Sequence, residues 1–334
     1  MSLAGPTFVK LAQWAASRTD LFSQQLCTEL GQLHDANTEH AAEHSRRQVC
    51  RLFGVDTLDQ VFDQFDDQAL GAGAVAQVHY ARFRADQLPP GTPATAANKE
   101  VAIKVLHPGV DRLIRRDLRI MHWGAVVIGW LPGMSWLSLA EEVRVFGTMM
   151  LAQLDLRVEA SNLRKFRANF SARPATRFPQ PLGVCSETVL IESYEDGVPL
   201  RAFLDASTPY DRALGAHGLE AFLHMLIYDN FVHADLHPGN ILVALRSPAS
   251  AVSPLDRFVE EFYEKSPFRR EYWLAERDPL PTSAQAHRRV REIMQKGDMK
   301  GVEEYVGALY ANGFSAELVM LDCGLATSLD ATNR

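Results

Sequence analysis

Apolar residues recur every three or four positions in several stretches of the chain, which is the period of an amphipathic helix. This pattern predicts helices over residues 7–22, 38–53, 57–65, 139–170 and 211–230, and the charged stretches 258–276 and 284–310 are also expected to be helical. The first three would form an N-terminal helical extension. The helix at 211–230 is rich in leucine and phenylalanine, so we expect it in the core of a larger lobe.

Strand-like alternation begins at the small residues of 71–78, where a hairpin is predicted. A turn rich in proline, threonine and alanine at 88–97 separates it from a strand at 101–105. Two strands are expected over 178–193 and a short one over 319–321. Helices and strands together predict an α+β fold.

The most apolar stretch is 120–139, which contains Trp123, Trp130 and Trp136. A membrane-spanning helix needs about 20 uninterrupted apolar residues. His122 and the Pro132–Gly133 pair interrupt this stretch. The sequence therefore favours a buried helix, a turn and a second helix, with membrane contact as the alternative.

The composition narrows the class of protein. With 334 residues, 47% of them hydrophobic, the chain can bury a sizeable core and form two lobes. A formal net charge of −7 argues against a nucleic-acid partner. The four cysteines show no C-x-x-C spacing, so neither a disulfide framework nor a zinc site is indicated, and a reducing compartment fits best. Residues 1–10 lack the pattern of a signal peptide, so any targeting segment is expected to be missing from this chain.

The polar loop 233–240, between two apolar runs, carries the strongest chemical signal. Asp235 is followed by Asn240 five positions later, as in the kinase pattern H-x-D-L-x-x-x-N. There the aspartate orients the attacking group and the asparagine binds Mg²⁺. The alternative is a surface turn, because these residue types are common in turns.

Two further motifs match the part of a kinase that holds ATP. Gly71, Gly73 and Val78 occupy three positions of the kinase loop G-x-G-x-x-G-x-V, in which small residues let backbone amides approach phosphates and valine covers adenine. The strand at 101–105 spells V-A-I-K, so Lys104 would pair the α and β phosphates. A plain β-turn and an edge-strand charge are the alternatives.

A kinase lysine needs a carboxylate on a helix, for which we predict Glu159, with Asp155 as the second candidate. The alternative is that Glu159 is a surface acid beside basic neighbours. Glu192 and Tyr194 belong to a predicted hinge that would bind adenine through main-chain groups. Asp322, followed by Cys323 and Gly324, matches the kinase D-F-G and would hold Mg²⁺.

These motifs together resemble the UbiB family of atypical protein-kinase-like proteins, also called aarF-domain-containing kinases, with the closest likeness among its mitochondrial members. The resemblance implies a two-lobed protein-kinase-like fold, ATP and Mg²⁺ as ligands, a mitochondrial location and a role in isoprenoid-quinone (ubiquinone) metabolism. Membrane lipid or proteins of that pathway are the implied partners. It also assigns Lys10, Gln13 and Asp155 to a family motif, whose N-terminal helix packs over the nucleotide pocket.

The chain departs from the family at several motif positions. Ala12 replaces a glycine of K-x-G-Q, and Gln153 replaces the glutamate of E-x-D, so Lys10 would have to pair with Asp155. Ala234 replaces the arginine of H-R-D, which removes the group that senses activation-loop phosphorylation. Gly71 and Gly73 stand where the family more often has alanine, which resembles an ordinary kinase.

The resemblance divides the chain into an extension at 1–66, a kinase-like N-lobe at 67–193 and a partial C-lobe at 194–334. The N-lobe would contain an inserted helical segment near 111–140. Asp322 follows Asn240 by 82 positions, so an insertion near 246–318 is expected. Few residues follow Asp322, so the large lobe is expected to be incomplete and its activity could be lost.

Three other functions remain open at this point. A small-molecule phosphotransferase of the choline or aminoglycoside kinase type shares the loop of Asp235 and Asn240, but the V-A-I-K strand counts against it. A nucleotide-binding scaffold without turnover would suit an incomplete large lobe. A helical interaction protein would need every motif to occur by chance and in kinase order.

Overall fold

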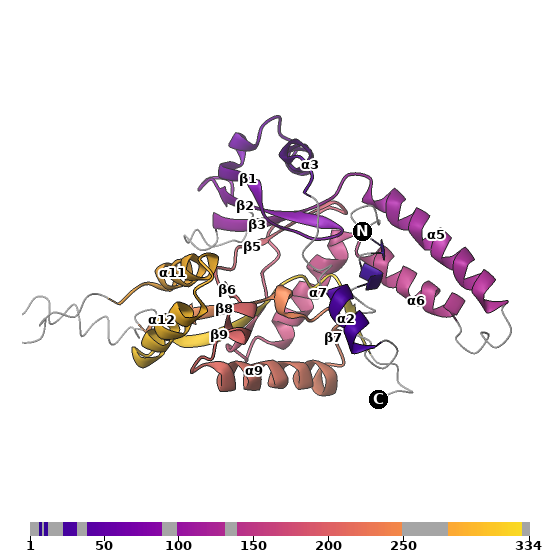
Figure 1. Cartoon of the computed structure of the whole chain (residues 1–334). Coiled ribbons are helices and arrows are strands. Elements are labelled where there is room, and N and C mark those ends of the chain that lie inside the picture. The colour runs from indigo at the N-terminus through magenta and orange to yellow at the C-terminus, as the bar shows by residue number, and fades with distance from the viewer. Residues whose placement is uncertain are drawn as a thin grey trace, which may run out of the picture. The chain divides into compact units, whose positions relative to one another are not determined.

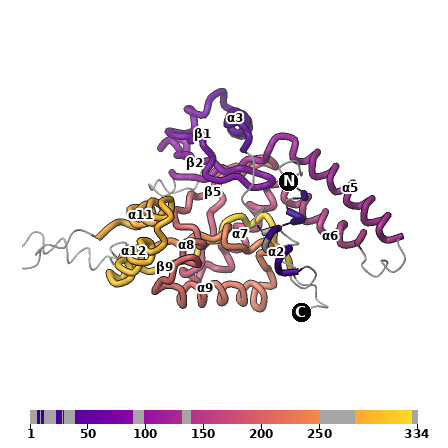
Figure 2. The backbone as a smooth tube through the Cα atoms, in the orientation of Figure 1, coloured from indigo at the N-terminus to yellow at the C-terminus, as the bar shows by residue number. Residues whose placement is uncertain are grey.

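The computed structural model describes residues 7–8, 10–12, 23–31, 39–88, 99–130, 139–248 and 280–328 (Figure 1). The chain divides into two units. Unit 1 comprises Met1–Lys165, Gln180–Tyr194 and Cys323–Leu325, and unit 2 comprises Phe166–Pro179, Glu195–Asp322 and Ala326–Arg334. Figure 2 lets the reader follow the backbone from one unit into the other along α7 (Leu156–Asn169).

Unit 1 is built on an antiparallel sheet of four strands in the order β1-β2-β3-β5. The strands are β1 (Phe62–Ala72), β2 (Ala76–Phe83), β3 (Glu100–Leu106) and β5 (Val189–Ser193). One face of the sheet packs against helix α3 (Ala42–Phe53), with Val49, Phe83 and Ile103 in the shared core (Figure 1). Because strand side chains alternate between faces, the even-numbered residues of β3 lie on the opposite face.

The predicted helix at 57–65 is wrong. Only Leu58–Gln60 forms a short 3-10 turn, and β1 begins at Phe62, before the expected end of the helical extension. Residues 58, 61, 62 and 65 have helical spacing, but Phe62 instead stacks on Phe83 of the neighbouring strand. Cross-strand packing of this kind outweighs local helical periodicity.

The other helices described in unit 1 are α2 (Gln24–Gly31), α5 (Val110–Gly129) and α6 (Leu139–Ala152), with the first part of α7. Helix α5 packs along α6 (Figure 1). Gly147 allows the close approach, since a Cβ there would lie 3.5 Å from the Leu118 side chain. The predicted single helix over 139–170 is wrong, because the chain leaves the helix between α6 and α7.

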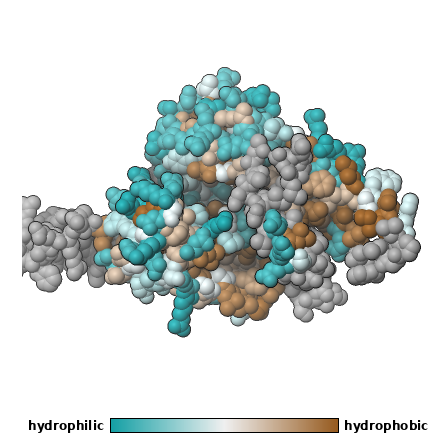
Figure 3. Space-filling model, viewed as in Figure 1, coloured by the Kyte–Doolittle hydropathy of each residue, from teal (hydrophilic) through white to brown (hydrophobic). Residues whose placement is uncertain are grey.

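The expectation of a buried helix at 120–139 is also wrong. Trp123 is 68% exposed and Trp130 is 79% exposed, because α5 buries only the side that carries Ile114 and Ala125. Figure 3 shows hydrophobic residues gathered on the surface of this hairpin. Trp136 lies outside the described residues. Within the described part of the chain, none of the helices combines the length and apolarity needed to cross a membrane.

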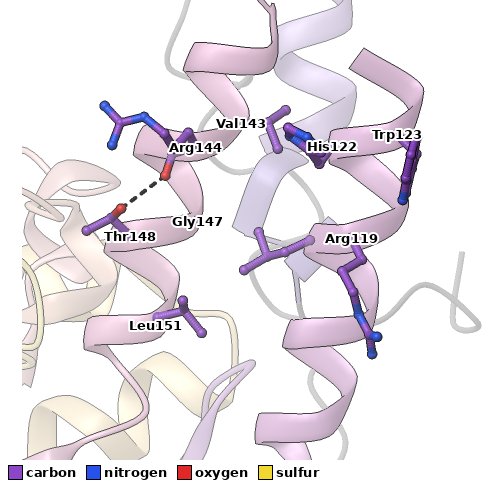
Figure 4. A pocket seen from close by; sticks show the side chains of 9 residues that line it. Arg119, His122, Trp123, Val143, Arg144, Gly147, Thr148 and Leu151 are labelled. Carbon is purple, nitrogen blue, oxygen red and sulfur yellow. Dashed lines mark hydrogen bonds between the residues drawn. The ribbon is translucent and has the colours of Figure 1, made fainter. Parts of the chain in front are cut away.

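A shallow groove runs between α5 and α6 (Figure 4). Arg119, His122 and Trp123 line it from α5, and Arg144 and Thr148 line it from α6. Its lining includes none of the residues predicted to bind nucleotide.

Unit 2 contains a second four-stranded sheet in the order β4-β9-β8-β6. The strands are β4 (Thr176–Arg177), β9 (Ser315–Met320), β8 (Ile241–Arg246) and β6 (Val198–Pro199). The described helices are α8 (Arg201–Leu204), α9 (Asp211–Leu223), α11 (Ser283–Gln295) and α12 (Met299–Ala311). Val243 and Leu318 of the sheet share a core with Val290 and Val306 of α11 and α12. A separate two-stranded ladder pairs β7 (Val232–His233) with β10 (Ala326–Thr327).

Two predicted helices of unit 2 need correction, and a third is not tested. The helix expected at 284–310 is two helices, because Gly297 has φ +72° and Asp298 caps the second one. The helix at 211–230 ends in a π-helical turn at His224–Tyr228. Its expected burial holds only in part, since Leu214 lies in the core but Leu219 is 61% and Ile227 65% exposed. The predicted helix at 258–276 lies outside the described residues.

The two strands expected over 178–193 are also not formed as predicted. The only strand within this range is β5, in unit 1, and β4 ends before residue 178. Pro181 makes only an isolated bridge to Glu192.

Candidate functional site

Lys104 lies in the middle of the unit 1 sheet and is paired with Glu159 of α7. The Lys104 Nζ to Glu159 Oε1 distance is 2.8 Å, and the two side chains are 13% and 4% exposed. β3 is flanked by β2 and β5, so Lys104 is not an edge-strand charge. Burial also removes the interpretation of Glu159 as a surface acid. The predicted contact between the two residues is therefore present, whereas their roles remain a prediction.

Val78 and Glu192 share a sheet face with Lys104. Val78 is the cross-strand partner of Lys104, and Glu192 is the partner of Ala102, two positions along β3. Directly opposed residues, and residues two apart on one strand, point to the same side of a sheet. The face opposite α3 therefore carries the residues predicted to contact adenine and phosphate.

The predicted glycine loop is the turn that joins β1 to β2. Gly71 lies near the end of β1, and the Gly73 N–H donates to the Ala76 carbonyl at 2.8 Å. Neither glycine has a positive φ. A Cβ on Gly73 would meet only the Ala76 carbonyl oxygen, at an ordinary 3.5 Å. The fold itself thus does not require glycine at these positions. The need for space near a ligand is a reason for the small residues that is consistent with this.

The predicted hinge follows β5. The Ser193 N–H donates to the Gln180 carbonyl at 2.8 Å, and the Tyr194 N–H donates to the Glu100 carbonyl at 3.1 Å. Adenine could use these two N–H groups only by replacing those bonds. The Tyr194 ring contacts the Tyr80 ring edge to face. The adenine-binding role of Glu192 and Tyr194 remains a prediction.

Helix α7 carries other polar groups besides Glu159. The Asp155 carboxylate accepts a bidentate pair of hydrogen bonds from the Arg157 guanidinium. These bonds hold the pKa of the Asp155 carboxyl below its ordinary value. Lys10 lies in a helical turn of residues 10–12, and its pairing with Asp155 remains a prediction. Gln13 lies outside the described residues.

One contact of α7 was not anticipated from the sequence. The Asn162 side chain donates to the Cys323 carbonyl oxygen at 2.9 Å, within the segment that follows Asp322. Asn162 comes three residues after Glu159, so both lie on one side of the helix. This spacing is a signal that could have identified Asn162 as a positioning residue.

The loop with Asp235 and Asn240 is held by a chain of hydrogen bonds in unit 2. The Asn240 amide nitrogen donates to the Asp235 carbonyl at 3.1 Å, and the Asp235 N–H donates to His233 Nδ1 at 3.2 Å. His233 Nε2 lies 3.3 Å from the Leu321 carbonyl, which can only accept, so Nε2 carries the proton. Burial lowers the pKa of His233, which keeps the ring in this neutral form.

Asp322 and Asn240 lie at the same end of two paired strands. Asn240 directly precedes β8, Asp322 closely follows β9, and Ile241 pairs with Met320. The Leu321 N–H donates to the Asn240 carbonyl at 2.8 Å. Asp322 has φ +48°, a left-handed conformation that is rare for residues other than glycine and that recurs at functional sites. The pairing of β8 with β9 thus brings the backbones of the two predicted metal ligands close together, although 82 positions separate them in the sequence.

The chemistry of these two groups fits Mg²⁺. The side-chain nitrogen of Asn240 donates to the Asp235 carbonyl, so the side-chain oxygen is the atom of Asn240 that can bind a metal. Asp322 provides a carboxylate. Mg²⁺ prefers oxygen ligands and is usually held by one or two protein groups together with phosphates. No cluster of three or more His, Cys, Asp or Glu residues suited to a metal occurs in the described part of the chain, so a metal held by protein side chains of those types alone is not indicated.

Comparisons with known proteins agree with these motifs. The family model of the ABC1 atypical kinase-like domain matches residues 32–257. The ABC1 family protein YPL109C, mitochondrial, of Saccharomyces cerevisiae is 34% identical over 348 residues, covering 100% of this chain and 49% of the relative. The ABC1 family protein C21C3.03, mitochondrial, of Schizosaccharomyces pombe is 41% identical over 263 residues, covering 72% of this chain and 37% of the relative.

Bacterial relatives match as well. The probable protein kinase UbiB of Edwardsiella ictaluri is 34% identical over 251 residues, which cover 73% of this chain and 44% of the relative. The chain thus spans about half the length, or less, of these relatives. Among solved structures, the Rv3197–erythromycin complex of Mycobacterium tuberculosis superimposes with a TM-score of 0.49 at 23% identity, covering 72% of this chain and 57% of the other.

The match to the family model covers more than half of the chain, and the fungal and bacterial relatives exceed 30% identity over more than two thirds of it. The expected α+β, protein-kinase-like fold is confirmed with it. The chain belongs to the ABC1 atypical kinase-like family, which includes the UbiB proteins.

Proposed function

We propose that this protein binds Mg-ATP and catalyses slow phosphoryl transfer from it, with hydrolysis as the principal outcome. The observation that carries the proposal is the buried Lys104–Glu159 ion pair on the sheet face that also bears Val78. A buried ion pair is costly to desolvate and is weak evidence for stability alone. In kinases this same pair orients the lysine toward the ATP phosphates.

Each predicted residue has a role in this proposal. Lys104 contacts the α and β phosphates, and Glu159 holds Lys104 in place. The backbone of the turn at Gly71 and Gly73 approaches the phosphates, Val78 covers the adenine, and Glu192 and Tyr194 bind its edge. These assignments follow the kinase pattern and rest on the shared sheet face and the ion pair.

Unit 2 supplies the remaining roles. Asn240 and Asp322 hold Mg²⁺, which when bound neutralises charge on the phosphates. Asp235 accepts a proton from the attacking water or hydroxyl, and its main chain is fixed by His233 and Asn240.

We also propose that the protein acts in mitochondria and in isoprenoid-quinone metabolism. The support is that the fungal relatives are mitochondrial proteins and the bacterial ones are named UbiB. Lys10, Gln13 and Asp155 would form the family motif over the nucleotide. Membrane lipid or proteins of that pathway would be the partners.

The test is product analysis with γ-labelled ATP, Mg²⁺ and the full chain. Release of inorganic phosphate that is lost in Asp235→Asn, with little label on protein, supports the proposal. Label transferred to an added small alcohol or amine would favour a small-molecule kinase. Binding of ATP without any product would favour a scaffold, and absence of binding would refute the nucleotide assignment.

A further inference from the structure

Four histidines gather on the α3 side of the unit 1 sheet, around Ser45 of α3. They are His40 and His44 at the start of α3, His79 of β2, and His107 just after β3. Ser45 and His79 are almost fully inaccessible to solvent. None of these histidines has a role in the nucleotide chemistry proposed above.

The hydrogen bonds form one continuous relay that ends on the glycine loop. His107 Nε2 lies 3.0 Å from the Gly73 carbonyl oxygen. His107 Nδ1 lies 2.7 Å from His40 Nδ1, and His40 Nε2 lies 2.8 Å from Ser45 Oγ. The His107 N–H also donates to the Val75 carbonyl at 2.9 Å. His107 therefore contacts the β1–β2 turn through both its ring and its main chain.

The protons of this relay can be assigned by elimination. The Gly73 carbonyl only accepts, so His107 Nε2 donates to it, and the neutral ring then accepts at Nδ1. His40 must therefore donate to it through Nδ1, and its Nε2 lies against the Ser45 hydroxyl, which also contacts His79 Nε2 at 2.9 Å. A second proton on the His107 ring would sit on Nδ1 and place two N–H groups against each other across the 2.7 Å contact. The contact between the two rings therefore requires the His107 ring to be neutral.

A second branch of hydrogen bonds runs through His79. His79 Nδ1 donates to the Asp66 carbonyl of β1 at 2.9 Å, and its Nε2 accepts from the Gln77 amide at 2.9 Å. The Gln77 side chain also exchanges two hydrogen bonds with the His40 main chain, which fixes its amide orientation. Two carbonyls of β1 and its turn, Asp66 and Gly73, are thus tied to the start of α3.

The surroundings keep these rings uncharged near neutral pH. Burial, followed by the neighbouring His107, His44 and His79, lowers the pKa of His40 to about 4. Burial likewise lowers the pKa of His107 and of His79. The charged groups that face the cluster are the following: Glu39, Arg46 and Asp67 beside His79, and Arg47 and Arg51 beside His44.

The contact of His107 with the Gly73 carbonyl also affects the orientation of the Gly73–Ala74 peptide group. In a trans peptide the C=O and the following N–H point in opposite directions. The odd-numbered residues of β3 face α3, and His107 continues that side. Holding the Gly73 oxygen at the His107 ring therefore turns the Ala74 N–H away from that histidine.

We propose that His107, supported by His40, is a positioning residue that orients the Gly73–Ala74 peptide so that its N–H can bind a phosphate of ATP. This inference rests on the proposed nucleotide function and adds a group that acts from behind the loop. His107 comes three residues after Lys104 on the same chain segment, so it couples the loop to the strand that carries the phosphate-binding lysine.

The test compares His107→Ala, His107→Gln and His40→Ala with wild type. Glutamine can accept from His40 and donate to Gly73, so it replaces both bonds of the ring. We expect His107→Ala to weaken Mg-ATP binding about tenfold and His40→Ala about threefold, as loss of about one hydrogen bond implies. His107→Gln should bind within about twofold of wild type. The exposed His122 provides the matched control, and His122→Ala should bind normally.

Hydrogen exchange of residues 71–78 without nucleotide gives a readout independent of ATP. His107→Ala should speed exchange in this segment, and His107→Gln should restore it. Equal ATP affinity in His107→Ala and wild type, or a glutamine variant no better than alanine, overturns the inference. If wild type itself does not bind Mg-ATP, the proposed function fails, and unchanged exchange at 71–78 in His107→Ala then rejects the relay separately.

Discussion

The buried ion pair of Lys104 with Glu159 predicts a large effect of single substitutions on stability. Removing one member leaves a charge buried without compensation, which typically costs roughly 3–5 kcal/mol. We therefore expect Lys104→Met and Glu159→Gln each to lower the free energy of unfolding strongly. The double variant should lose less than the sum, with a coupling energy of about 0.5–3 kcal/mol, measured by denaturant unfolding.

The matched control is the ion pair of Arg144 with Glu141, which lies exposed on α6. Its coupling should be too small to resolve, because solvent screens exposed pairs. Additive effects at Lys104 and Glu159 would show that the buried contact does not form in solution.

Glycine at 73 and glycine at 109 differ in conformation, and this predicts different costs of alanine. Gly109 has φ +69° at the start of α5, so Gly109→Ala should cost about 1–2 kcal/mol. Gly73 has no positive φ and only an ordinary contact, so Gly73→Ala should change stability by less than about 1 kcal/mol. Thermal unfolding of the two variants measures the difference, and an equal loss would contradict the described turn.

At the scale of elements, α5 has two unlike sides. Ile114 is fully buried and Trp130 is 79% exposed. Ile114→Ala should therefore lower the free energy of unfolding by roughly 2–5 kcal/mol, and Trp130→Ser by less than about 0.5 kcal/mol. Denaturant titration of both variants decides this. A large loss in Trp130→Ser would mean that the tryptophan is covered in the folded protein.

Helix α11 is anchored to the segment after the hinge by Asp196. His287 and Arg291 of α11 both donate to Asp196, and His287 accepts the Leu245 N–H at 2.7 Å. Burial opposes ionisation of Asp196, but these hydrogen bonds outweigh it and hold the pKa of its carboxyl below the ordinary value.

The sign of the pH effect follows from that depressed pKa. Near pH 4 the unfolded chain binds more protons at this position than the folded chain, so stability from Asp196 is present above about pH 4 and is lost as pH falls through the folded pKa. Asp196→Asn should therefore reduce the slope of unfolding free energy against pH below about 4. If the slope of unfolding free energy against pH is unchanged in Asp196→Asn, ionisation of Asp196 does not contribute to stability in acid.

Short motifs were better predictors than long periodic patterns. The spelling around Lys104 and its helix-borne acid identified a contact that the structure forms. Helical spacing at 57–65 and 284–310 failed, because pairing of β1 with β2 and the turn at Gly297 override local periodicity. The relay through His40 and His107 was not predictable, since its members are far apart in sequence and carry no common motif.

At the scale of the whole molecule, the predicted ATP ligands are distributed over both units. Lys104 belongs to unit 1, whereas Asn240 and Asp322 belong to unit 2. The proposed function assigns both sets of residues to the binding of Mg-ATP. Ligand at 100 times its dissociation constant should then stabilise the chain by about 2.7 kcal/mol.

We accordingly expect Lys104→Met and Asp322→Asn each to abolish most of the thermal stabilisation by Mg-ATP, although the two substitutions lie in different units. Trp130→Ser, remote from the predicted ligands, should keep the full shift. Omitting Mg²⁺ should reproduce the loss seen in Asp322→Asn, because that carboxylate acts through the metal. Full stabilisation of Asp322→Asn would refute the metal assignment, and full stabilisation of Lys104→Met would mean that the nucleotide binds without the unit 1 lysine.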